Sequence, residues 1–224
     1  MSYSRENSSP YAVSNALNQS FLWMFGGLLL TALTSFVVAG NANLMNAIFS
    51  NAIIFYGLII AELGLVFFLS IRVQHMSFEA ALTTFLVYSI LNGVTLSAIF
   101  VLYTSASIGS CFLIAALLFG VMAVYGYTTK RDLTSIGNIA LMALVGIIIA
   151  SLVNLFLKNN GLSIIISYLA IAIFVGLTAY DSQKIKRMAA SGAGANIGIL
   201  GALSLYLDFI NIFLNLLRLF GKQK

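Results

Sequence analysis

The sequence predicts an all-α membrane protein of seven transmembrane helices, with the last helix central in the bundle. Hydrophobic residues make up 61% of its 224 residues and charged residues only 8%, whereas charged residues are about 25% of a typical soluble domain. Seven apolar stretches are long enough to cross a bilayer, since about 20 residues at a rise of ~1.5 Å span its hydrocarbon core. The single Cys111 excludes a disulfide within the chain.

The elements follow one another with short connections. Residues 1–20 are polar and rich in Ser and Asn, and we expect a mostly disordered tail. Residues 21–220 are predicted to form one seven-helix transmembrane domain, and residues 221–224 a short basic tail. The first apolar stretch is too long for a secretory leader and lacks a basic segment before it, so it is predicted to be a helix. The expected spans are residues 21–39, 51–72, 78–103, 108–127, 136–157, 162–187 and 197–220.

Charges in the loops predict the orientation. Basic residues follow the second, fourth and sixth spans, whereas residues 40–50 and 104–107 carry no charge. Because basic loops stay in the cytoplasm, we expect a cytoplasmic amino terminus. Arg218, Lys222 and Lys224 would lie outside if the seventh span crosses fully. Full crossing is favoured here, and a re-entrant last helix remains open.

The seventh span carries a narrow polar stripe. Its members recur three or four residues apart, so they share one helix face; they are Gly201, Ser204, Asp208, Asn211, Asn215 and Arg218. A carboxylate near the bilayer centre is costly, so Asp208 must face protein or water inside the bundle. This placement predicts the central position of the helix.

Four ionisable residues within the spans direct the functional argument: Glu62, Arg72, Asp181 and Asp208. Carboxylates inside a membrane are functional by default. The predicted orientation puts Arg72 and Asp181 toward the same side, which allows an ion pair. Two aspartates that face each other in a low dielectric cannot both ionise freely, so one is expected to hold a proton near neutral pH. This arrangement predicts a pH switch.

A structural interpretation stays open beside the functional one. Asp208, Asn211 and Asn215 could serve as hydrogen-bonding glue between helices, each worth about 0.6 kcal/mol. Arg72 could then be a membrane-interface anchor. Amides fit this interpretation better than carboxylates, because buried amides are often structural.

Four segments in order carry a resemblance: AELGLVFFLSIR around Glu62 and Arg72, GYTTKRDLTSIG from Gly126, AYDSQKI around Asp181, and ALSLYLDFINIFLNLLRLFG at the carboxyl end. With them the chain resembles the transmembrane Bax inhibitor motif family, and its small bacterial members most closely. The match covers almost the whole chain.

The resemblance implies seven helices, with the last enclosed by the other six, and a pH-sensitive calcium leak in the bacterial plasma (inner) membrane. It implies that Asp181 and Asp208 sense protons and that Arg72 is a latch that exchanges partners with them. Glu62 matches an acidic position on the ion path, and Asn211 and Asn215 could lead an ion along the last helix.

Calcium would be the transported ion, with no tightly bound cofactor. Calcium prefers six to eight oxygen ligands, so Asp181 and Asp208 with neighbouring oxygens predict at most a weak site. Low affinity suits a leak.

Other functions compete with this interpretation. A non-conducting regulator of a protease or of a stress or cell-death pathway remains the alternative, with a membrane protease as a suggested partner. Asp208 lies in LYLDF rather than after the glycine-x-glycine turn of intramembrane aspartyl proteases, so no enzymatic activity is expected. The formal charge of +5 comes from residues spread over span ends, and nucleic-acid binding is not expected. The sequence leaves the oligomeric state open.

Overall fold

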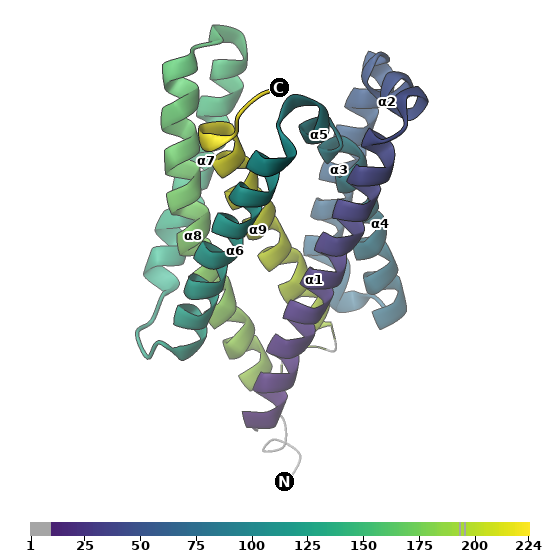
Figure 1. The fold of residues 1–224 in the computed structure, drawn as a ribbon. Coiled ribbons are helices and arrows are strands. Elements are labelled where there is room, and N and C mark those ends of the chain that lie inside the picture. Colours follow the sequence, from purple (N-terminus) through teal and green to yellow (C-terminus); the bar gives the residue numbers. More distant parts are fainter. Residues whose placement is uncertain (1–9, 193, 195) are drawn as a thin grey trace, which may run out of the picture. The chain divides into compact units, whose positions relative to one another are not determined.

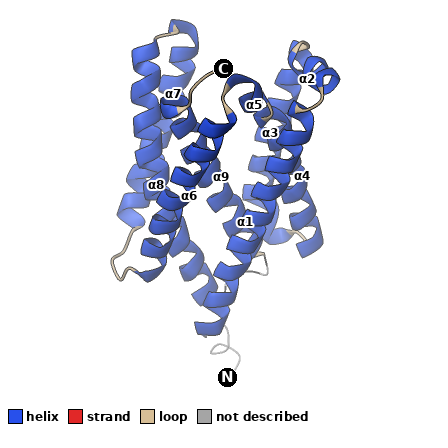
Figure 2. Cartoon of the chain, viewed as in Figure 1, coloured by secondary structure: helices blue, strands red, loops and turns tan. Residues whose placement is uncertain are grey.

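The computed structural model describes residues 10–192, 194 and 196–224, and these form a set of helices (Figures 1 and 2). Among these described residues, seven helical stretches are long and apolar enough to cross a membrane, as predicted. Within the described residues the chain adds one isolated bridge, between Tyr103 and Gln223. The chain divides into two compact units. The domain prediction, a single unit over residues 21–220, stays a prediction.

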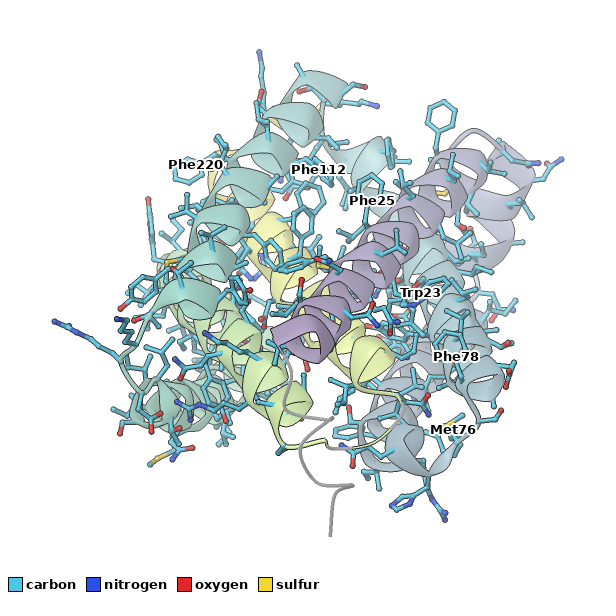
Figure 3. All side chains as sticks on the ribbon, turned by 90° about the horizontal axis from the view of Figure 1, so that it is seen from below. Trp23, Phe25, Met76, Phe78, Phe112 and Phe220 are labelled. Atoms are coloured by element: carbon cyan, nitrogen blue, oxygen red, sulfur yellow. The ribbon has the colours of Figure 1, made fainter. Side chains whose placement is uncertain are left out.

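The first unit holds the amino-terminal helices, together with residues 187–206 and 223–224. Its helices are α1 (Pro10–Ala39), α2 (Ala42–Phe49), α3 (Ala52–Arg72), the short 3-10 helix η2 (Val73–His75), α4 (Phe78–Leu96) and α5 (Ala98–Leu102). Trp23 of α1 packs on Phe78 at the start of α4, with 6.0 Å between ring centroids (Figure 3). A Cβ at Gly93 of α4 would collide with the backbone of Thr31, so glycine permits the close approach of α1 and α4.

The second unit holds residues 106–186 and 207–222. It contains α6 (Ser105–Thr128), α7 (Thr134–Leu157), most of α8 (Asn160–Ala190) and the second half of α9 (Ile197–Phe220). Phe112 and Phe119 of α6 pack edge-on against Phe209 of α9, with centroids 5.1 Å and 5.7 Å away.

Helix α9 is uninterrupted and the most buried of the seven spans. In its most apolar stretch 72% of the residues are buried, against 6% in the spans that contain α3 and α7. Its residues 197–206 belong to the first unit and residues 207–220 to the second. This burial agrees with the expected enclosed helix, and the bounds of α9 are those expected from the sequence.

The amino-terminal segment differs from the expected disorder at residues 10–19. Helix α1 begins at Pro10, in a segment that we expected to be a disordered tail. Leu17 and Ser20 are buried, which explains why this polar segment is ordered. Residues 1–9 of the predicted tail lie outside the described residues.

Two further differences arise from local hydrogen bonds. The uncharged loop expected at residues 40–50 contains α2, because the Asn41 carboxamide oxygen accepts the backbone N–H groups of Asn43 and Leu44 and caps the helix. The third span, expected to be continuous, changes from α4 to α5 at Ser97. The Ser97 hydroxyl donates to the Val94 carbonyl at 2.7 Å, a local bond that competes with the helical pattern.

Candidate functional site

The second unit brings the two predicted aspartates together. Asp208 lies in the middle of α9 and is only 3% exposed. Asp181 of α8 is half-buried and close enough for its charge to act on Asp208. The Thr178 hydroxyl lies beside the Asp208 carboxyl group and donates to the Phe174 carbonyl at 2.8 Å. The second carboxyl oxygen, Oδ2, is buried and has no hydrogen-bond partner among the described residues.

Close packing holds the α8 segment around Asp181. A Cβ at Gly126 of α6 would collide with the backbone of Ala179, and a Cβ at Gly137 of α7 would enter the ring of Tyr180. On the next turn, the Gln183 carboxamide accepts from the Leu133 N–H at 2.9 Å and donates to the Arg131 carbonyl at 2.8 Å. These contacts fix α8 against α6, α7 and the loop between them.

The pair has a limited chemistry. A buried carboxyl oxygen without a donor is costly, and a nearby carboxylate of the same charge adds repulsion. A proton or a cation bound at the pair would reduce both the cost of the unpaired oxygen and the repulsion between the carboxylates. Among the described residues no group of three or more His, Cys, Asp or Glu side chains is placed to hold a metal ion. A calcium ion at the pair would therefore need hydroxyl, carbonyl and water ligands.

The predicted latch lies in the other unit. Arg72 ends α3 and its side chain is exposed. The turn that follows it is held by Asn196, whose side-chain nitrogen donates to the carbonyls of Val73 at 2.7 Å and Met76 at 2.8 Å. Sequence reasoning missed Asn196, although an asparagine just before a helix is a typical capping signal. An Arg72–Asp181 pair stays a prediction.

Glu62, the predicted ion-path carboxylate, belongs to a hydrogen-bonded cluster in the first unit. The Thr95 hydroxyl donates to its Oε1 at 2.8 Å, and the Asn92 side-chain nitrogen lies 3.4 Å from its Oε2. The Tyr206 hydroxyl donates to the Asn92 Oδ1 at 3.1 Å and lies 2.6 Å from the Thr31 hydroxyl.

Sequence reasoning missed the neutral members of this cluster. The sequence shows only that these polar side chains lie inside apolar spans. Such residues are common, and the sequence does not show which of them contact one another.

The two asparagines on the polar stripe use their amides within α9. The Asn211 nitrogen donates to the Leu207 carbonyl and the Asn215 nitrogen to the Asn211 carbonyl, each at 2.8 Å. Both side chains are half-buried. These local bonds fit the structural interpretation of the amides, and a role in an ion path stays a prediction. Cys111 is a free thiol, buried in α6.

Fold and site together define an integral membrane protein of α-helical type, with half-buried or buried carboxyl groups in its spans. A family model described as "Inhibitor of apoptosis-promoting Bax1" matches residues 13–224. The chain therefore belongs to the Bax inhibitor family, as the resemblance predicted.

Bacterial membrane proteins are among its relatives. "Inner membrane protein YbhL" of Escherichia coli (strain K12) is 49% identical over 212 residues, which cover 92% of this chain and 91% of the relative. A membrane protein of Streptococcus pyogenes serotype M1 is 40% identical over 216 residues, covering 92% and 94%. A Deinococcus radiodurans protein is 39% identical over 211 residues, covering 92% and 90%.

Proposed function

We propose that this protein is a pH-sensitive calcium leak channel in the bacterial plasma membrane. In this proposal Asp181 and Asp208 form the proton sensor and Arg72 is the latch. The observation that carries the proposal is the aspartate pair, in which the buried Asp208 has an acidic neighbour and one oxygen that meets no hydrogen-bond donor in the described part of the chain. A membrane helix would not carry such a group without a proton or a cation to compensate it.

The proposed mechanism uses one proton shared by the pair. When both carboxyl groups are ionised they repel each other, and Arg72 compensates Asp181 by an ion pair that closes the path. Protonation of the pair removes the negative charge of Asp181, so its ion pair with Arg72 is lost and the path opens. We therefore expect the calcium flux to rise as the pH falls through the titration of the pair.

The test is calcium entry into sealed vesicles that contain the purified protein and a calcium-sensitive dye, measured over a series of pH values. The account expects flux above that of empty vesicles, with a marked dependence on pH. Glu79→Gln is the matched control, because Glu79 is an exposed carboxylate in the first turn of α4 and should leave the profile unchanged. Flux equal to that of empty vesicles at every pH would favour a non-conducting regulator.

Orientation is a separate part of the proposal. The amino terminus should be cytoplasmic, so a reporter fused after Lys186 should be cytoplasmic and one inserted at Asn43 should be outside. A reporter after Lys224 should be outside if α9 crosses fully. The opposite labelling at the first two positions would overturn the orientation.

A further inference from the structure

The cluster around Glu62 contains a chain of side chains from three other helices. It runs from Glu62 of α3 through Asn92 of α4 and Tyr206 of α9 to Thr31 of α1. Tyr206 is 0%, Thr31 3% and Asn92 9% exposed. The rings of Phe85 and Tyr88 pack edge-on against Tyr206 at 5.8 Å and 5.7 Å, so the position of its hydroxyl is fixed.

The chemistry of Glu62 sets the orientation of the Asn92 amide. An ionised carboxylate only accepts hydrogen bonds, so the Asn92 nitrogen must face Glu62 and its oxygen must face Tyr206. Tyr206 then donates to Asn92, and the 2.6 Å contact with Thr31 requires Thr31 to donate to Tyr206. In this arrangement every side chain of the relay has a partner.

The same atoms allow a second arrangement. The Thr31 hydroxyl also lies 2.9 Å from the Ser89 carbonyl, so three contacts share two hydroxyl hydrogens. If Thr31 donates to Ser89, Tyr206 can donate to Thr31. The Tyr206 oxygen can then accept a hydrogen bond. If the Asn92 carboxamide rotates by half a turn, its nitrogen faces Tyr206 and donates that hydrogen bond.

Turning the amide changes what Glu62 faces. The Asn92 oxygen would now lie beside the carboxylate, which is repulsive unless a cation sits between them. The Thr95 hydroxyl has a second acceptor as well, the Asn92 backbone carbonyl at 3.0 Å, so its oxygen can also turn to a cation. Carboxylate, amide and hydroxyl oxygens are the ligands that calcium prefers.

We propose that Thr31, Tyr206 and Asn92 form a reversible hydrogen-bond relay that builds a weak cation site at Glu62. Without a cation the relay points the Asn92 nitrogen at Glu62. With a cation bound by Glu62, Asn92 and Thr95, the relay reverses and Thr31 accepts the hydrogen of Tyr206. The inference rests on the proposed function, since it assigns Glu62 and its neighbours to the ion path.

Thr31→Val is the decisive variant. Thr31 makes one hydrogen bond in the cation-free arrangement, to Tyr206, and two in the cation-bound arrangement, with Ser89 and Tyr206. Thr31→Val therefore removes one more hydrogen bond from the cation-bound arrangement, so calcium affinity at Glu62 should fall about fivefold, the typical effect of one hydrogen bond. Thr31→Ser should restore it. Ser35→Ala is the matched control, because Ser35 is also a buried hydroxyl of α1 that donates to an α4 carbonyl, that of Gly93 at 2.7 Å, and lies outside the relay.

The measurement is a calcium titration of the purified protein by infrared difference spectroscopy. The carboxylate band of Glu62 is identified by its loss in Glu62→Gln. In a Tyr206→Phe background Thr31→Val should have no further effect, because the hydroxyl between them is gone. Asn92→Asp presents an oxygen to Glu62 in either orientation of its side chain, so no hydrogen bond has to be broken to turn it. This variant should bind calcium about fivefold more tightly, which is the typical effect of one hydrogen bond.

Three results would overturn the relay: no calcium-dependent Glu62 band, an equal loss of affinity in Ser35→Ala, or a Thr31→Val effect that persists in Tyr206→Phe. If Thr31→Val fails to fold, Asn92→Asp decides: calcium binding by this variant no tighter than by the wild type would overturn the relay. Vesicles without calcium flux, together with the expected titrations, would reject the leak and leave the relay standing.

Discussion

The two carboxyl clusters differ in how they are compensated. Both oxygens of Glu62 accept hydrogen bonds, from Thr95 and Asn92, in the first unit. Asp208, in the second unit, has an acidic neighbour in Asp181 and one oxygen for which the described residues provide no donor. The carboxyl group of Glu62 thus has a neutral donor at each oxygen, whereas that of Asp208 lacks a donor at Oδ2 among the described residues. From this difference we propose an ion-binding role for the Glu62 cluster and a pH-sensing role for the aspartate pair.

Helix α9 takes part in both clusters. Tyr206 of the first cluster and Asp208 of the second are two residues apart in the sequence of α9. Tyr206 is hydrogen-bonded within the first unit, and Asp208 lies near Asp181 in the second.

The largest expected effect is at the aspartate pair. Asp181→Asn and Asp208→Asn should each abolish the pH dependence of calcium flux, because asparagine hydrogen-bonds but does not titrate. The double variant should do little more than either single variant, as expected of residues that share one proton. Flux in sealed vesicles at several pH values checks this, and additive effects would show that the two carboxyl groups act separately.

The second prediction concerns Arg72. Arg72→Ala should raise the flux at high pH and flatten the pH response, since the closing ion pair is lost. Arg72→Lys retains the charge and should keep part of the response. Lys130→Ala, which removes an exposed cation of the α6–α7 loop, is the control. A correctly folded Arg72→Ala with the wild-type profile would reduce Arg72 to an interface anchor.

A smaller and different effect is expected at Glu62. Glu62→Gln should lower the calcium flux severalfold while the shape of the pH profile stays as in the wild type, because the aspartate pair is intact. The same vesicle assay measures both quantities. If Glu62→Gln removed the pH response as Asp208→Asn does, the proposed division between the clusters would be incorrect.

The smallest set of changes tests the packing beside Asp181. Gly126→Ala places a Cβ against the Ala179 backbone and should destabilise the fold by about 2 kcal/mol, as overpacking does. Gly120→Ala, on the same helix α6, meets no atom within 4 Å and should be neutral or slightly stabilising. Thermal unfolding in detergent compares them, and equal stability of the two variants would contradict the close α6–α8 approach.

The sequence predicted the spans because length and hydropathy determine them almost alone. It missed α2 and the start of α1, where order depends on the Asn41 cap and on the burial of Leu17 and Ser20. The aspartate pair was predictable because carboxylates are rare inside membranes.

The neutral partners of the carboxyl groups were not predictable from the sequence. Thr178, Asn92 and Tyr206 are ordinary residues in helical spans, and only their proximity in three dimensions gives them a role. Their bonds join segments far apart in the chain, such as Asn92 and Tyr206.

The central claim is that Asp181 and Asp208 titrate as one unit. An infrared titration of the Asp208 carboxyl group, identified by its loss in Asp208→Asn, tests this without any flux. The account predicts that the titration curve of Asp208 shifts when Asp181 is replaced by asparagine, because the two groups share a proton in the wild type. An identical curve in the wild type and in Asp181→Asn would contradict it.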